Sequence, residues 1–149
     1  MPPRTPDRGT AYFPQLAAER LDIALCRASS AVARTAEAHT ATTGLAVGHH
    51  LVLKMLAESG PCSQATLSDE LRIDRSVMVG ICDSLERDGN AHRERDTVDR
   101  RAYAVTITAA GRRQLKRAEA SVPELLDEAF GRLSAGEREQ LAALLGKLL

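Results

Sequence analysis

A single period-two segment in an otherwise helical sequence constrains the fold most strongly. Tyr103, Val105 and Ile107 alternate with smaller or polar residues, which is the pattern of a β-strand with one buried face. Residues 91–95 can form its antiparallel partner, and the polar residues 96–101 between them predict a hairpin loop. Because the apolar residues elsewhere recur at helical spacing, we expect a mainly α fold with a small β-hairpin.

Two short helices in tandem are predicted before this hairpin. Ser63 is a suitable N-cap for a helix that holds Leu67 and Leu71. Asp74 can cap a second helix, which ends near Gly89. A short helix, a tight turn and a second helix together predict a helix-turn-helix. The buried face of its second helix is expected to hold, at four-residue intervals, Val77, Ile81 and Leu85.

Helical segments also precede this central part. From about Pro14, apolar residues follow one face of a helix as far as a break that ends at Gly44. A second helix is predicted after Gly44, and it stops at residues 59–61, Ser-Gly-Pro.

The segment after the hairpin is predicted to be helical to the end of the chain. Thr108 can cap its first helix, and Pro123 predicts a kink or a new start near Ser121. Ser134 and Glu137 fit a capping box at the start of the last helix.

Composition limits the class of protein. A chain of 149 residues suits one domain, and its 3% of aromatic residues favours packed helices over an aromatic-rich β-sandwich. No signal peptide or apolar run of membrane-spanning length is evident, and three widely spaced cysteines form no disulfide framework. We therefore expect a cytoplasmic protein with no membrane partner.

The charge of the chain is balanced overall but unevenly distributed. The 20 Lys and Arg residues equal the 20 Asp and Glu residues, so the formal net charge at pH 7 is zero. Residues 92–113 nevertheless contain six arginines and three acidic residues, a local excess of +3. Because nucleic-acid binding depends on where basic residues gather, this segment is the predicted contact with nucleic acid.

The order of several short motifs resembles the MarR family of winged helix-turn-helix regulators. The most specific part is an Asp-Arg-Arg triplet at the hairpin tip, followed by a strand and a Thr-x-x-Gly helix start. The segments that carry the resemblance are 51–61, 63–76, Leu85–Gly89, Arg93, Asp99–Arg101 and Thr106–Arg112.

The resemblance implies a single domain over residues 14–149 after a flexible tail, residues 1–13. Residues 14–44 and 108–149 would form dimerisation helices, and residues 45–107 a winged helix-turn-helix lobe. The implied function is that of a homodimeric, sequence-specific transcriptional regulator, expected to be a repressor. It would bind a pseudo-palindromic operator in double-stranded DNA, with an affinity modulated by a small phenolic or acidic ligand or by a redox signal.

Ten residues are candidates for DNA contact. The predicted recognition helix offers Arg75 for guanine and Ser76 for a base or phosphate, and either Val79 or Met78 for a thymine methyl group. Met78 fits the core equally well. The full set of candidates is Ser63, Gln64, Arg75, Ser76, Val79, Arg93, Arg95, Asp99, Arg100 and Arg101.

The hairpin supplies the basic candidates in this set. Arg100 and Arg101 are expected to enter a narrow minor groove, while Asp99 fixes the turn and orients one of them. Arg93 and Arg95 are expected to contact phosphate. Ser63 and Gln64 lie at the start of the first helix of the helix-turn-helix, where they are also placed to contact phosphate. Ser63 also serves as the N-cap of that helix.

Four residues are candidates for effector sensing: Cys26, His39, His49 and His50. The histidines would meet an acidic or phenolic ligand, although a helix histidine is more often structural. Cys26 resembles the sensing cysteine of the organic-peroxide-responsive branch of the family, although a buried inert cysteine is commoner. Zinc sensing by these residues with Glu37 is weaker, because no His-x-x-x-His pair occurs.

The sequence offers little support for an enzyme. It contains no Gly-rich phosphate loop, GxSxG elbow, HExxH pair or other motif that marks a nucleophile and its base. We therefore expect no catalytic residue, no cofactor and no metal. The alternative function is a winged-helix module that binds another protein and has lost DNA binding, which the apolar Val79 and Gly80 favour.

Overall fold

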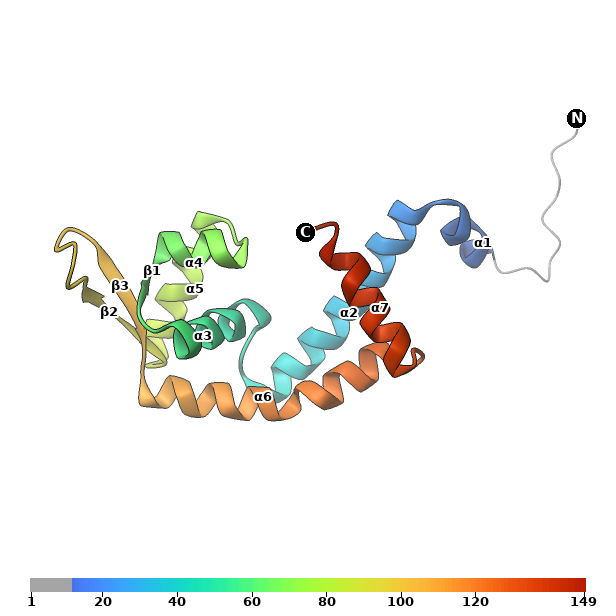
Figure 1. Ribbon diagram of the computed structural model, residues 1–149. Helices are drawn as coiled ribbons and strands as arrows, with labels where there is room; N and C mark the ends of the chain where they lie inside the picture. The colour runs from blue at the N-terminus through green and yellow to red at the C-terminus, as the bar shows by residue number, and fades with distance from the viewer. Residues whose placement is uncertain (1–11) are drawn as a thin grey trace, which may run out of the picture.

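The computed structural model describes residues 12–149 and has two parts, which a long helix connects (Figure 1). One part, the lobe, spans residues 45–107. Its elements are α3 (Val47–Ser59), β1 (Cys62–Ser63), α4 (Gln64–Leu71), α5 (Arg75–Arg87), β2 (Ala91–Arg95) and β3 (Tyr103–Ile107). The other part consists of α1 (Tyr12–Glu19), α2 (Leu21–Thr43), α6 (Ala109–Phe130) and α7 (Ala135–Gly146). The predicted mainly α fold with a small hairpin is confirmed.

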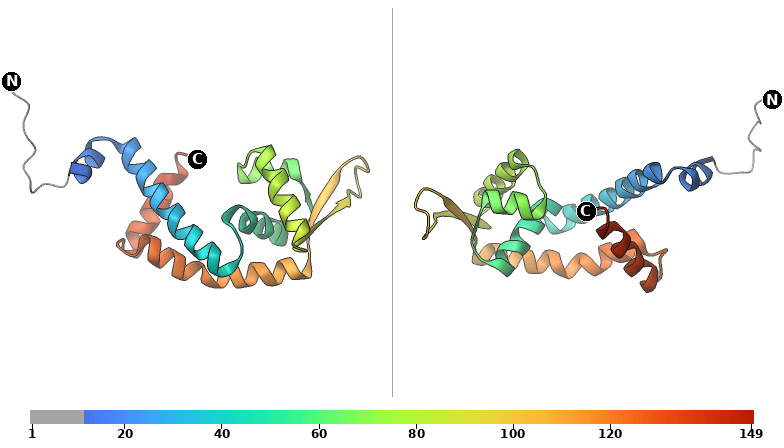
Figure 2. Two further views of the ribbon diagram at one scale, coloured as in Figure 1. Left: turned by 180° about the vertical axis from the view of Figure 1, so that it is seen from behind. Right: turned by 45° about the horizontal axis from the view of Figure 1, so that its top comes forward.

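The sheet is a three-stranded antiparallel arrangement in the order β1-β3-β2. The predicted hairpin is confirmed: β2 and β3 pair from Ala91 opposite Ile107 to Arg95 opposite Tyr103. Cys62 in β1 pairs with Val105 on the other side of β3. Residues 91–107 therefore form a wing, which projects from the lobe in both views of Figure 2.

The core of the molecule lies inside the lobe. Its largest fully buried side chains come from α3, α4, α5 and β3, so the two predicted short helices are fixed against α3 and the sheet. These side chains are Val52, Leu53, Leu56, Leu67, Met78, Cys82, Leu85 and Val105. Burial raises the pKa of the Cys82 thiol, as expected for a core cysteine.

The N-terminal helical stretch is divided, contrary to the prediction of one helix from Pro14. Arg20 is extended, with φ −125° and ψ 90°, and separates α1 from α2. Its guanidinium group pairs with Asp22 at 2.7 Å in the first turn of α2. Helix α2 then ends at Gly44, which adopts the left-handed conformation, so the predicted break is confirmed.

Helix α6 connects the lobe to the other helices. The Thr108 hydroxyl caps it by accepting a hydrogen bond from Gly111 N–H at 3.0 Å, as predicted. The helix continues through Pro123, so the predicted new start near Ser121 is wrong. Ser121 instead donates a hydrogen bond to the carbonyl of Ala118 within the same helix.

The helices outside the lobe bury little within one chain. Helices α1, α2 and α7 contain no buried residue, although the predicted capping box of Ser134 and Glu137 closes the start of α7. Between Tyr12 and Leu149, no helix has both the length and the apolar character needed to cross a membrane.

Candidate nucleic-acid interface and ligand pocket

The first turn of α4 is closed by its own residues. The hydroxyl of Ser63 accepts a hydrogen bond from Thr66 N–H at 3.1 Å, so the predicted N-cap is confirmed. Gln64 faces the wing, where its side-chain oxygen accepts a hydrogen bond from Arg93 Nε at 2.8 Å. The phosphate contacts of both residues stay predictions.

Helix α5 presents one face to the core and another to solvent. Met78, Ile81, Cys82 and Leu85 are buried at helical spacing, which assigns Met78 to the core. The prediction for Val77 is wrong, because 53% of this residue is exposed. A strict four-residue interval drifts around a helix of 3.6 residues per turn, so Val77 lies at the edge of the buried face. Asp74 precedes α5, but its side chain makes no capping hydrogen bond.

The DNA-contact candidates of α5 all lie on its exposed side. Arg75, Ser76 and Val79 are exposed, and Arg75 pairs with Asp69 of α4 at 3.3 Å. Both partners of that ion pair are about two-thirds exposed, so the contact contributes little and leaves the guanidinium free to exchange partners.

Arg93 is engaged inside the protein. Its guanidinium group is 2.5 Å from carboxylate oxygens of both Asp83 and Glu86 on α5, and its side chain is only 22% exposed. Hydrogen bonds from the backbone N–H and the guanidinium of Arg93 hold the pKa of Glu86 below its usual range. With Gln64 as a further partner, Arg93 ties β2 to both helices of the helix-turn-helix. Its surroundings therefore favour a positioning role over the predicted phosphate contact.

The tip of the wing is held by hydrogen bonds from its backbone. Asp99 accepts a hydrogen bond from Arg101 N–H at 3.0 Å, which agrees with its predicted part in the turn. Within residues 12–149, Asp99 forms no ion pair with Arg100 or Arg101, so the structure lacks the predicted bond that would orient one of them. Arg95 donates to the carbonyl of Arg100 at 2.7 Å and lies over the ring of Tyr103.

The two arginines at the tip remain available to a partner. Arg100 and Arg101 are exposed, and neither guanidinium forms an ion pair within the part of the chain that the structure describes. Exposed cations on a projecting hairpin beside α5 form a surface suited to a polyanion.

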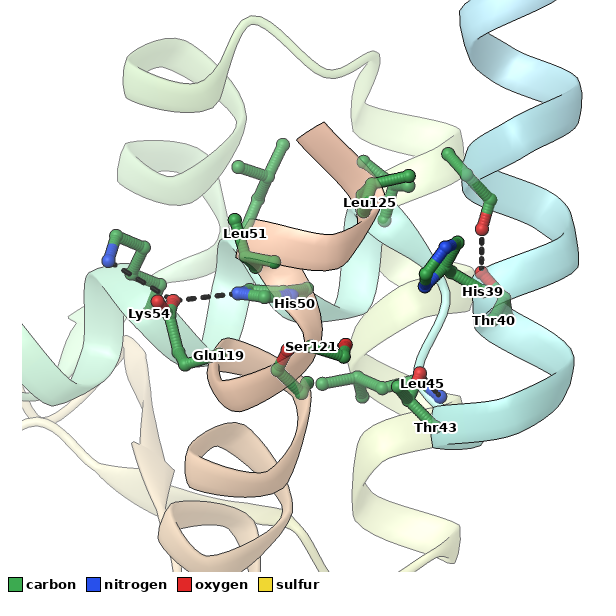
Figure 3. Close-up of a pocket in the computed structure, with 14 residues that line it drawn as sticks. His39, Thr40, Thr43, Leu45, His50, Leu51, Lys54, Glu119, Ser121 and Leu125 are labelled. Carbon is green, nitrogen blue, oxygen red and sulfur yellow. Dashed lines mark hydrogen bonds and ion pairs between the residues drawn. The ribbon is translucent and has the colours of Figure 1, made fainter. Parts of the chain in front are cut away.

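A cavity of about 330 Å³ lies between α2, α3 and α6, where the lobe meets the long helices (Figure 3). Its walls are mainly apolar, and two predicted effector residues, His39 and His50, line it. His39 pairs with Glu128 at 3.0 Å, and His50 pairs with Glu119 at 2.7 Å. The remaining lining residues are Ala36, Thr40, Thr43, Leu45, Val47, Leu51, Lys54, Ala118, Glu119, Ser121, Val122 and Leu125.

Sequence reasoning missed the two residues of this cavity that carry a full charge. Lys54 and Glu119 interact at 3.1 Å, and Figure 3 shows Lys54 and His50 reaching the same carboxylate. These two partners lower the pKa of Glu119, with the hydrogen bond from His50 as the larger cause. The four-residue spacing of His50 and Lys54 placed both on one face of α3, which was the available signal.

The other two effector candidates lie away from this cavity. His49 is half-buried on α3 but is not a lining residue, and burial lowers its pKa. Cys26 is exposed on α2, so the structure places it neither in the cavity nor in a buried inert position. Residues 12–149 contain no group of three or more His, Cys, Asp or Glu residues placed to hold a metal ion.

The sequence is similar to those of known transcriptional regulators. Residues 43–102 match the sequence model described as MarR family. The chain is 33% identical over 109 residues to a putative transcriptional regulatory protein for the hcr operon of Thauera aromatica, covering 73% of this chain and 66% of that protein. It is 30% identical over 105 residues to the transcriptional repressor Rv2887 of Mycobacterium tuberculosis, covering 70% of this chain and 76% of that protein.

Solved structures agree with these relationships. A probable transcriptional regulator from Pseudomonas aeruginosa superposes with a TM-score of 0.77 at 31% identity, covering 87% of this chain and 100% of that one. Rv2887, described as a MarR family protein, superposes in its complex with DNA with a TM-score of 0.69, covering 87% of this chain and 97% of that one. Rv2887 has also been solved in complex with salicylic acid, and that structure gives a TM-score of 0.67.

Proposed function

Because this chain belongs to the MarR family, we propose that it is a homodimeric regulator that binds double-stranded DNA through its lobe. We further propose that it acts as a repressor and that a small ligand in the cavity changes its affinity for DNA. The observation that carries the proposal is the wing, which offers Arg100 and Arg101 to a polyanion next to the exposed face of α5. Family membership supports a regulator over an enzyme.

The exposed apolar surface supports the homodimer. The chain exposes 10,920 Å². A compact protein of this mass would expose about 8,800 Å², even with residues 1–11 counted at the area of an unfolded chain. The excess of about 2,000 Å² is in the range that stable homodimers bury. Large apolar side chains outside the lobe supply part of it, namely Tyr12, Phe13, Leu21, Leu25, Leu126, Leu144, Leu148 and Leu149.

DNA binding is tested with the variant Arg101→Ala. We expect wild-type protein to bind DNA from upstream of its own gene in the presence of excess nonspecific competitor, and the variant to bind at least about tenfold more weakly. Because a dimer has two wings, the log–log slope of affinity against salt should fall in magnitude by about 1.8. Fluorescence anisotropy in a salt series measures both quantities.

The control is Arg132→Ala, which removes an exposed arginine beyond the far end of α6. It should keep wild-type affinity. Absence of specific binding by an intact dimer would contradict the proposal and favour the module that binds another protein. Unchanged binding by Arg101→Ala would contradict only the assignment of the wing.

The cavity supports a ligand with an apolar body and an acidic group. Apolar walls suit a ring. His39, His50 and Lys54 pair with Glu128 and Glu119 in the free protein, and a carboxylate or phenolate of the ligand would take the place of those acids. Salicylate is a suitable probe because it satisfies both requirements and because Rv2887 was solved with it. We expect millimolar salicylate to release the protein from DNA.

The variant His50→Gln tests this site. Loss of a charge-assisted hydrogen bond should raise the salicylate concentration for half-release about tenfold, while affinity for DNA without ligand stays unchanged. His49→Gln is the matched control, because His49 is the neighbouring residue of α3 and does not line the cavity. Equal responses of both variants would contradict the assignment of the cavity.

A further inference from the structure

The exposed side of α5 includes an apolar side chain. Val79 is 44% exposed, and it follows Arg75 by one turn and precedes Asp83 by one turn on the same ridge of the helix. Gly80 lies beside it on the exposed side. We propose that Val79 contacts a thymine methyl group and that Gly80 lets the α5 backbone approach the floor of the major groove. This inference rests on the proposed DNA binding and adds the base that α5 selects.

The polar side chains that follow Val79 on α5 are largely occupied, whereas Arg75 and Ser76 in its first turn are exposed to a partner. Asp83 is held by Arg93 at 2.5 Å, so its carboxylate is directed at the wing. Arg87 donates a hydrogen bond to Ser84 at 3.0 Å and pairs with Asp88 at 3.5 Å. The middle of α5 therefore offers a base pair one methyl-bearing side chain and a gap, rather than a pair of hydrogen-bonding groups.

No contact within the described chain explains why residue 80 is a glycine. A glycine in a helix interior destabilises the helix relative to alanine, because it loses more backbone freedom on folding. Its φ is not positive, and a Cβ built at this position would meet no atom within 4 Å. Nothing in the described chain therefore requires residue 80 to lack a side chain. A close approach of the α5 backbone to an external surface would require a glycine there.

Thymine is the base that fits this surface. On the major-groove edges of the four base pairs, the C5-methyl group of thymine is the apolar feature, and the other groups are donors or acceptors. A valine side chain gains contact area against that methyl group but cannot satisfy a buried donor or acceptor. The half-site read by α5 should accordingly contain thymine at the position opposite Val79.

The test is a double-mutant cycle between protein and DNA. Sites are first selected from random-sequence duplexes by the wild-type protein, and each thymine is then replaced by deoxyuridine, which removes only the methyl group. Burial of one methyl group corresponds to about a fourfold change in affinity, and to about 15-fold when both half-sites are substituted. We expect that loss at one symmetric pair of thymines for the wild type, and none for Val79→Ala at the same pair.

The matched control is Val77→Ala. It removes the same groups from the same helix, but residue 77 points about 160° away from residue 79 around the helix axis. This variant should keep the wild-type sensitivity to deoxyuridine. Selection of no sequence would overturn the proposed function together with this inference. Selected sites that bind equally well with deoxyuridine at every thymine would overturn the inference and leave DNA binding standing.

Gly80→Ala gives a second, independent readout. Alanine should raise the thermal stability of the free protein, because it favours the helix and has space for its methyl group. The same variant should bind the selected sites at least about tenfold more weakly, because the added methyl group meets the groove floor. A stabilised variant with wild-type affinity would overturn the close approach at Gly80.

Discussion

Replacing Gly111 by alanine is expected to lower the free energy of unfolding by at least about 2 kcal/mol. Gly111 lies in the first turn of α6 and is buried. A Cβ there would collide with the backbone carbonyl of Asn90 and lie 2.9 Å from Cγ1 of Ile107. The collision with backbone is costly, because Asn90 is also held by a hydrogen bond from Thr108 N–H at 3.1 Å. The melting temperature should fall by about 4–8 °C.

The control for this prediction is Gly136→Ala in α7. A Cβ at Gly136 would meet no atom within 4 Å, so this variant should be as stable as the wild type or slightly more stable. Both variants are compared at one protein concentration, since the proposed dimerisation would make the melting temperature concentration-dependent. A Gly111→Ala protein that melts within 1 °C (~0.3 kcal/mol) of the wild type would contradict the packing described here.

Replacing Arg93 by glutamine is expected to weaken DNA binding about fivefold at low ionic strength. The variant removes the single cation beside Asp83 and Glu86 on α5, the helix proposed to face DNA. Because one guanidinium offsets one of the two carboxylate charges, each protomer gains one uncompensated negative charge, which costs about 0.5 kcal/mol against a phosphate about 8 Å away in a water-like dielectric. The proposed dimer has two such charges, so the total is about 1 kcal/mol.

Neutralising one acid separates this mechanism from a direct phosphate contact. The double variant Arg93→Gln, Glu86→Gln has the same net charge at this cluster as the wild type, so the second change should restore most of the affinity. A double variant that binds as weakly as Arg93→Gln alone would contradict the positioning role and favour the original prediction that Arg93 contacts phosphate.

Local signals predicted much of the fold. The hairpin followed from alternation at Tyr103, Val105 and Ile107, and the helix starts at Ser63 and Thr108 followed from side chains that can accept a backbone N–H. These signals depend on residues close in sequence. The break at Arg20 had no such signal, because Arg20 has no side-chain capping bond and is otherwise compatible with a helix.

The candidate site was predictable only where a contact is local. Asp99 was identified with the turn because its partner, Arg101, is two residues away. The partners of Arg93 lie 7, 10 and 29 residues away, and they come together only when α4, α5 and β2 pack. The cavity likewise needs α2, α3 and α6 together, so its Glu119 could not be found from helix periodicity alone.

The attachment of α6 has a mechanical consequence. One end of the helix is fastened to the turn between α5 and the wing by hydrogen bonds from Thr108 to Gly89 and Asn90, while Glu119 borders the cavity. Ten residues of α-helix separate these points, a lever arm of about 15 Å. A tilt of about 5° at the cavity would displace the fastened end by about 1.3 Å. With the opposite displacement in the second subunit of the proposed dimer, the two α5 helices would shift by about 2.6 Å. This change in separation is close to the rise of about 3.4 Å between base pairs, so a small tilt of α6 would move both α5 helices out of register with their half-sites on DNA.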